Sequence, residues 1–168
     1  MLHQRNPADR PVDRRSMLLS GVALLGALCA APPARAAAGF EVTRTDEEWR
    51  RHLTPEGYRV LRRHGTERAG SSPLDGETRR GTYHCAGCAL PLYRSDTKFD
   101  SRTGWPSFWI PIEGAVGTSK ERGLFGVRTE VHCRRCGGHL GHVFDDGPRP
   151  TGQRYCMNGV ALMFEVAS

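Results

Sequence analysis

The sequence lacks a strong excess of charge of one sign, and its main part lacks a basic cluster. The 168-residue chain has a formal net charge of +6. Residues 1–36 carry five arginines against two aspartates, so the remainder has a net charge of only +3. A surface that binds nucleic acid normally concentrates Lys and Arg on one face. We therefore expect no nucleic-acid partner.

The sequence also lacks an apolar run long enough to cross a membrane. The longest run, residues 17–31, is shorter than the ~20 residues that a spanning helix needs, which disfavours a single membrane anchor. The run follows Arg14-Arg15 and precedes Ala34-Arg35-Ala36, which is the layout of a cleaved export signal. The paired arginines resemble those of a twin-arginine signal.

This layout predicts two segments. We expect residues 1–36 to be a cleaved export signal, with cleavage after Ala38 as the alternative. Residues 37–168 then form one exported domain, located in the periplasm and without stable membrane insertion. Cys29 lies in the signal and follows Leu28, a bulky residue where a lipoprotein signal has a small one, so no role is assigned to it.

Helix signals occupy the start of the expected domain. Thr45 and Glu48 have the spacing of a capping box and predict a short helix that carries Trp49. Thr54 followed by Pro55 predicts a second helix, which runs to residue 65.

Strand signals follow residue 81. Residues 65–80 mix Gly, Ser, Pro and charges and indicate a loop. Apolar and other residues alternate over residues 125–131 and 160–166, which predicts strands. The fold class expected from these patterns is mainly β with two short N-terminal helices.

Four cysteines form two Cys-x-x-Cys pairs, Cys85 with Cys88 and Cys133 with Cys136. Two such pairs suit one tetrahedral Zn²⁺, because each short turn points both sulfurs inward. A disulfide framework is the alternative in an oxidising compartment. A site closed by four thiolates has no open position for substrate, so the zinc would be structural.

Cys156 is left without a partner, and a buried structural cysteine is one interpretation of it. On a strand, Arg154 and Asn158 would share its face. His139 and His142 lie upstream on either side of a glycine. A thiol near an arginine and imidazoles is expected to have a lowered pKa and to be reactive.

Two other interpretations of these residues remain open. The His-x-x-His pair could bind a second metal together with Asp145 or Asp146. A cysteine–histidine arrangement would also suit a hydrolase. Spacing alone does not separate these possibilities.

Three longer motifs carry a resemblance to a known family. They are GWPSF at residues 104–108, CRRCGGHLGHVF at residues 133–144 and GQRYCMN at residues 152–158. Together they closely resemble the methionine-(R)-sulfoxide reductase family, MsrB. The likeness begins near Trp49 and runs to about Phe164, which is essentially the whole expected domain.

The resemblance implies an antiparallel β fold of two packed sheets and a structural zinc on the four paired cysteines. It implies Cys156 as the nucleophile, with Trp105 packed against the methyl group of the substrate. It also implies a set of residues around the sulfoxide oxygen, namely His139, His142 and Asn158 with Arg154 nearby. The expected substrates are oxidised proteins that carry the R epimer of methionine sulfoxide.

In the implied reaction the Cys156 thiolate attacks the sulfoxide sulfur while His142 protonates the oxygen. Methionine leaves, and Cys156 becomes a sulfenic acid. Many members of the family carry a resolving cysteine where this sequence has Thr103. We therefore expect a cycle with a single cysteine, in which a thioredoxin-like protein or a small thiol reduces Cys156.

Two functions from other classes compete with this one. A zinc-ribbon binding module would leave Cys156 structural and use basic residues to contact a partner. A cysteine hydrolase would form an acyl-enzyme instead of a sulfenic acid.

Overall fold

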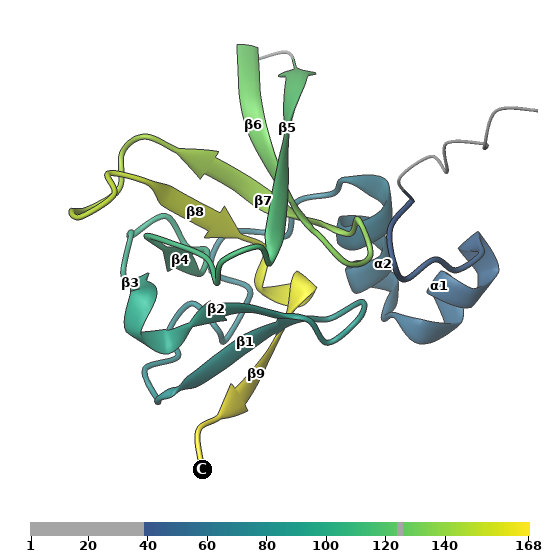
Figure 1. Cartoon of the computed structure of the whole chain (residues 1–168), viewed down its shortest axis with the longest axis horizontal. Coiled ribbons are helices and arrows are strands. Elements are labelled where there is room, and N and C mark those ends of the chain that lie inside the picture. The colour runs from purple at the N-terminus through teal and green to yellow at the C-terminus, as the bar shows by residue number, and fades with distance from the viewer. Residues whose placement is uncertain (1–38, 124–125) are drawn as a thin grey trace, which may run out of the picture. The chain divides into compact units, whose positions relative to one another are not determined.

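The computed structural model describes residues 39–123 and 126–168. The expected export signal, residues 1–36, lies outside the described residues. Two helices lead into a set of short strands (Figure 1). The helices are α1 (Asp46–His52) and α2 (Pro55–Arg63). The strands are β1 (Gly81–Cys85), β2 (Pro91–Arg94), β3 (Lys98–Phe99), β4 (Ser107–Phe108), β5 (Val116–Gly123), β6 (Gly126–Cys133), β7 (His139–Phe144), β8 (Arg154–Met157) and β9 (Leu162–Val166).

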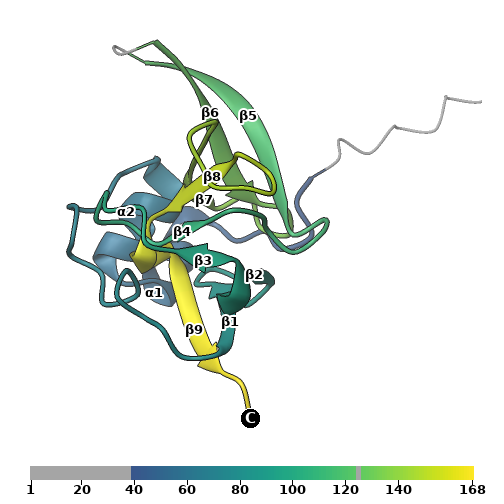
Figure 2. The same ribbon diagram turned by 90° about the vertical axis from the view of Figure 1, so that its left-hand side faces the viewer.

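The strands form two antiparallel sheets. A three-stranded sheet has the order β2-β1-β9, and a six-stranded sheet has the order β3-β4-β8-β7-β6-β5. Every strand pair in them is antiparallel. The hairpin of β5 and β6 extends beyond the rest of its sheet (Figure 2). The expected fold class, mainly β with two antiparallel sheets and two short helices, is confirmed.

Aromatic side chains join the two sheets. Tyr93 of β2 stacks on Phe108 of β4 with ring centroids 4.3 Å apart, and Tyr83 of β1 meets the same ring edge-on at 4.9 Å. The Tyr93 hydroxyl also donates to the sulfur of Met157 in β8 at 3.2 Å. All four side chains are fully buried, so this cluster is the centre of the hydrophobic core.

Both helices begin at the caps that the sequence indicates. The Thr45 side chain accepts from the Glu48 N–H while the Glu48 carboxylate accepts from the Thr45 N–H, which completes a capping box. Thr54 caps α2 and Pro55 takes its first position. The helix ends where His64 adopts a left-handed conformation, with φ of 53°.

The C-terminal strand differs from the expectation. Val160 lies in a short 3-10 turn, η2 (Gly159–Ala161), and β9 begins only at Leu162. The carboxylate of Glu67 accepts hydrogen bonds from the backbone N–H groups of Gly159 and Val160, so this segment cannot pair as a strand. Residue 125, where we placed the start of the other strand, lies outside the described residues, and β6 begins at Gly126. None of the described helices is long and apolar enough to span a membrane.

Candidate functional site

The four paired cysteines converge on one point. The sulfur atoms of Cys85, Cys88, Cys133 and Cys136 all lie within 4.8 Å of one another, and none of them forms a disulfide. The Cys85–Cys136 and Cys88–Cys133 sulfur distances are 3.7 and 3.5 Å. Four sulfurs placed tetrahedrally at ~2.3 Å from a zinc ion would be about 3.8 Å apart. The donor set and its spacing therefore fit one tetrahedral metal ion and disfavour the disulfide framework.

Two turns of the same form present these cysteines. The carbonyl of Cys85 accepts from the N–H of Ala89 at 2.8 Å, and the carbonyl of Cys133 accepts from the N–H of Gly137 at 2.9 Å. Ala89 and Gly137 both have positive φ, 57° and 67°. One turn follows β1 of the three-stranded sheet and the other follows β6 of the six-stranded sheet, so a metal here would link the two sheets.

A second site is a pocket of about 130 Å³ at the end of β7 and β8. Four of the six residues predicted from the sequence for catalysis and substrate binding line it, namely Cys156, His142, Asn158 and Trp105. Thr66, Arg128, Gly141 and Phe144 complete the lining. His139 and Arg154 do not line this pocket.

Strand pairing brings the sulfur of Cys156 to the pocket. Cys156 is in register with His142 of β7 on one side and with Ser107 of β4 on the other. The hydroxyl of Thr103 lies 3.9 Å from the Cys156 sulfur. Thr103, where the resemblance led us to look for a resolving cysteine, thus contacts the thiol directly.

The expected lowering of the Cys156 pKa is wrong, because burial raises the pKa of the Cys156 thiol. The Thr103 hydroxyl, the charge of Arg154 and the Ser107 hydroxyl act in the opposite direction but do not outweigh burial. Burial therefore favours the protonated form of the thiol.

Arg154 forms an ion pair with the carboxylate of Asp146. Its guanidinium makes two parallel hydrogen bonds of 2.8 Å to Asp146 and lies over the ring of Phe144 at 4.4 Å. Asp145 accepts from the side chain of Gln153 at 2.7 Å. Neither aspartate is available to the two histidines, so this structure does not assemble the second metal site that the His-x-x-His spacing left open.

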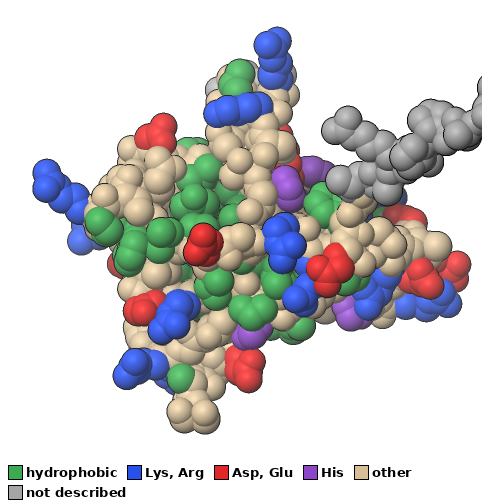
Figure 3. Space-filling model, in the orientation of Figure 1, with side chains coloured by type: hydrophobic (Ala, Val, Ile, Leu, Met, Phe, Trp, Pro, Cys, Tyr) green, Lys and Arg blue, Asp and Glu red, His purple; other side chains and the backbone are tan. Residues whose placement is uncertain are grey.

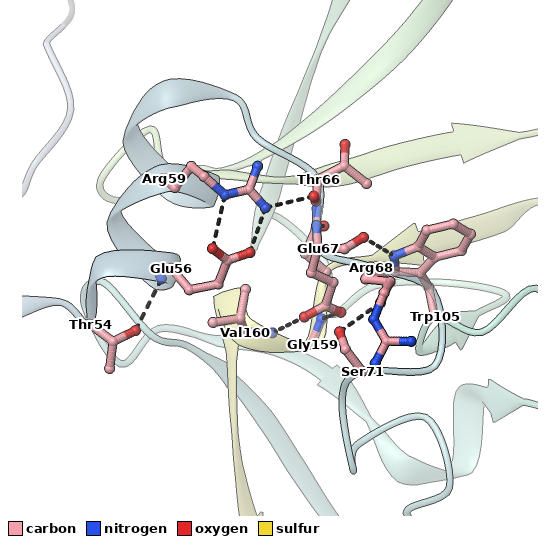
Figure 4. A network of polar contacts seen from close by, with 12 residues as sticks. Thr54, Glu56, Arg59, Thr66, Glu67, Arg68, Ser71, Trp105, Gly159 and Val160 are labelled. Carbon is pink, nitrogen blue, oxygen red and sulfur yellow. Dashed lines mark hydrogen bonds and ion pairs between the residues drawn. The ribbon is translucent and has the colours of Figure 1, made fainter.

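Asn158 and Trp105 are both held by one residue that the sequence did not indicate. The Asn158 amide oxygen accepts from the Glu67 backbone N–H at 2.9 Å. The Trp105 indole N–H donates to the Glu67 carbonyl at 3.3 Å (Figure 4). The Asn158 amide nitrogen donates to the Leu140 carbonyl at 3.0 Å. Both the oxygen and the nitrogen of the Asn158 amide are therefore hydrogen-bonded to the backbone, which fixes this side chain at the edge of the pocket.

The two histidines have separate carboxylate partners. His142 Nε2 lies 2.8 Å from Glu121 Oε2, and His139 Nδ1 lies 2.8 Å from Glu130 Oε1. The His139 side chain is 1% exposed and sits behind that of His142, with ring centroids 5.3 Å apart. Neither glutamate had a motif that identified it, since each reaches its histidine only through the pairing of β5, β6 and β7.

Comparison with known proteins identifies the family. A family model described as the SelR domain matches residues 53–166. The chain is 52% identical over 126 residues to the peptide methionine sulfoxide reductase MsrB of Agrobacterium fabrum, which covers 74% of this chain and 93% of that protein. It is 51% identical over 127 residues to the protein of the same name from Leptospira interrogans, covering 75% and 97% of the two chains. For the MsrB of Pseudomonas putida strain W619 the identity is 52% over 126 residues, covering 74% and 95%. The chain therefore belongs to the family of MsrB methionine sulfoxide reductases and is an oxidoreductase.

Proposed function

We propose that this protein reduces the R epimer of methionine sulfoxide in oxidised proteins, with Cys156 as the nucleophile. One observation supports this most directly. In a chain of the MsrB family, the sulfur-bearing Cys156, the imidazole of His142 and the flat apolar face of Trp105 line one small pocket. A dialkyl sulfoxide needs those three features: a nucleophile for its sulfur, an acid for its oxygen and an apolar surface for its methyl group.

In the first half-reaction Cys156 Sγ attacks the sulfoxide sulfur and gives up its proton. The attack forms an Sγ–S bond while His142 protonates the sulfoxide oxygen. The hydroxyl group then moves to Sγ as the S–O and Sγ–S bonds break, which leaves Cys156 as a sulfenic acid and releases methionine. The substrate sulfur gains two electrons and the Cys156 sulfur loses two. The proton lost by the thiol balances the proton gained by the oxygen, so this half-reaction consumes no net proton.

The other predicted residues support this reaction indirectly. Arg154 places positive charge beside the Cys156 sulfur, which favours its thiolate form. Asn158 holds the pocket edge through Glu67 and Leu140, and His139 packs behind His142. We propose that these three residues shape the site, while Cys156, His142 and Trp105 touch the substrate.

A thiol from another molecule completes the cycle. The other cysteines of the described residues, Cys85, Cys88, Cys133 and Cys136, form the metal cluster, so none of them is free to reduce Cys156. One thiolate of a thioredoxin-like protein or of a small thiol attacks the sulfenic sulfur and releases water, and a second thiol then displaces Cys156. The reductant leaves as a disulfide, and Cys156 returns to the thiol.

We further propose that the four-cysteine cluster holds a structural Zn²⁺. Cys85, Cys88, Cys133 and Cys136 would be its ligands, and the ion would stabilise the junction of the two sheets without taking part in the reaction. We also propose, from the signal-like residues 1–36, that the protein is exported to the periplasm. There it would meet oxidised proteins and a periplasmic reductant.

Replacement of the nucleophile tests the function. Purified protein with dithiothreitol should reduce a peptide containing the R epimer of methionine sulfoxide and leave the S epimer unchanged. The Cys156→Ser variant should bind the same peptide but show no turnover, while Cys88→Ser should lose metal and stability instead. Turnover by Cys156→Ser, or equal reduction of both epimers by the wild type, would contradict the proposal.

A further inference from the structure

The base of the β5–β6 hairpin carries a cluster of histidines and carboxylates beside the pocket. Figure 3 shows histidine side chains at the surface beside this hairpin, and the contacts between side chains define the cluster. The members of the cluster are His64, Glu121, Glu130, His139 and His142. Of these residues only His142 lines the pocket, so Glu121 is the carboxylate in contact with the pocket imidazole.

Glu121 has the geometry of a carboxylate that orients a histidine. Its Oε2 lies 2.8 Å from His142 Nε2, and its Oε1 lies 3.4 Å from His64 Nδ1. Across the hairpin it is in register with Arg128, whose guanidinium lies 3.7 Å from Oε2. The Glu121 carboxylate thus lies between the side chains of His64 and Arg128 while it accepts a hydrogen bond from His142.

The charge state of Glu121 agrees with this role. The hydrogen bond from His142 lowers the pKa of Glu121, against the opposing effect of burial, so the carboxylate is ionised at neutral pH. An ionised carboxylate can only accept hydrogen bonds, so His142 must carry its proton on Nε2. The other ring nitrogen, Nδ1, is then the one that can take up the proton given up by the Cys156 thiol and pass it to the sulfoxide oxygen.

The remaining groups of the cluster face the same imidazole. Glu130 is in register with His142 across β6 and β7, but its Oε1 is occupied by His139 and its Oε2 accepts from Ser119. Cys156 is in register with His142 on the other side, in β8. Glu121 is therefore the carboxylate that bonds His142 directly.

A cation site is a less suitable interpretation of the same cluster. His64, Glu121, Glu130 and His139 have ligand atoms within 4.8 Å of one another. An imidazole bound to a metal normally donates its other N–H to a partner. Within the described residues His139 Nε2 is buried and has no such partner, and Arg128 already lies against Glu121.

We propose that Glu121 is a positioning residue for the reaction: it selects the ring nitrogen and fixes the orientation with which His142 delivers a proton to the sulfoxide oxygen. This inference rests on the proposed role of His142 as the acid. The same arrangement orients the histidine of serine proteases, where a buried carboxylate bonds the ring nitrogen that does not face the reaction.

The test compares Glu121→Gln and Glu121→Asp with Glu165→Gln in the full chain. Glu165 of β9 pairs with His84 at 3.2 Å, so its substitution removes a carboxylate from a histidine at a strand that does not line the pocket. The measurement is the single-turnover rate of sulfenic acid formation at Cys156 from pH 6 to 9, together with KM for an R-sulfoxide peptide. Histidine ring ¹⁵N spectra report which nitrogen of His142 carries the proton.

We expect Glu121→Gln to lower the single-turnover rate about 10-fold or more with KM unchanged. Its rate should also fall off at a lower pH than that of the wild type, and the His142 ring signals should show a mixture of tautomers. Glu121→Asp should restore part of the rate, and Glu165→Gln should match the wild type. Thermal unfolding of each variant checks that it is folded.

A Glu121→Gln rate and pH profile equal to those of Glu165→Gln would overturn the inference. A drop in rate accompanied by unchanged His142 ring signals would do the same, since it would assign Glu121 a structural role. Failure of the proposed function is distinguishable, because wild-type protein would then form no sulfenic acid at all.

Discussion

Replacement of Glu67 by Gln should destabilise the protein and disturb the pocket together. Glu67 is 5% exposed, and its two carboxylate oxygens accept from the N–H groups of Gly159 and Val160. Its backbone N–H donates to Asn158. Its carbonyl accepts from the indole of Trp105 (Figure 4). Gln keeps one acceptor oxygen, but its NH₂ group then faces a backbone N–H that has no other acceptor.

The magnitude follows from these contacts. Loss of a hydrogen bond to a charged group costs about 1.5–3 kcal/mol, and a buried donor left without a partner costs about 1–3 kcal/mol. Part of this cost is offset because Gln removes the penalty of burying a charge. That penalty is visible in the pKa of Glu67, which burial raises above its usual value. We expect a net loss of about 2 kcal/mol in the free energy of unfolding at pH 7.

The raised pKa also gives the expected pH dependence. A carboxyl whose pKa is raised on folding contributes most below the pKa of the unfolded chain, and this contribution is lost as the pH rises through the folded pKa. The Glu67→Gln variant lacks it. The gap in stability between wild type and variant should therefore widen as the pH is lowered from 7 to about 5.

Urea unfolding of the metal-loaded proteins, followed by tryptophan fluorescence, measures the loss. Glu56→Gln is the matched control, since Glu56 forms an exposed ion pair with Arg59 beside the same network, and this variant should unfold close to the wild type. KM for the sulfoxide peptide should rise in Glu67→Gln alone, because Trp105 and Asn158 shift. Equal urea midpoints for the two variants would contradict the stabilising role of the buried Glu67 carboxylate.

Three further outcomes follow from the structure. Thr103→Val removes the hydroxyl that contacts the Cys156 sulfur, so the pKa of Cys156 should rise further. Alkylation of Cys156 by iodoacetamide should then need a higher pH, and an unchanged alkylation profile would contradict this. Gly141→Ala should cost at least about 2 kcal/mol in urea unfolding, because its Cβ would lie 2.1 Å from the Cys156 carbonyl oxygen, and a stable variant would contradict the close approach of β7 and β8. Chelation should release one Zn²⁺ per chain, measured with a colorimetric zinc indicator, and should lower the melting temperature; a metal-free protein with unchanged melting would contradict the structural role of the cluster.

Local signals predicted much of the fold. The caps at Thr45 and Thr54 lie within three residues of the groups that they bond, so a short stretch of sequence was sufficient to place both helices. The Cys-x-x-Cys pairs likewise predicted a convergent cluster, because each pair is a turn with its own internal hydrogen bonds. The sheet arrangement came from the family resemblance and is confirmed.

Contacts between distant segments were not predicted. The Glu67 carboxylate accepts from the N–H of Val160, which lies 93 residues later in the chain, and so interrupts the expected strand. Glu121 reaches His142 only through the register of three strands. The pKa of Cys156 was predicted in the wrong direction because its neighbours are visible in the sequence but its burial is not. Export and cleavage stay predictions, since residues 1–36 lie outside the described part of the chain.

Trapping the oxidised cysteine tests most directly whether Cys156 is the nucleophile. Wild-type protein without any reductant is mixed with a peptide carrying R-methionine sulfoxide, treated with a dimedone reagent, digested and examined by mass spectrometry. We expect one equivalent of reduced peptide and one dimedone adduct on Cys156, and neither with the S epimer. Reduced peptide without an adduct on Cys156, or with an adduct on another cysteine, would contradict it.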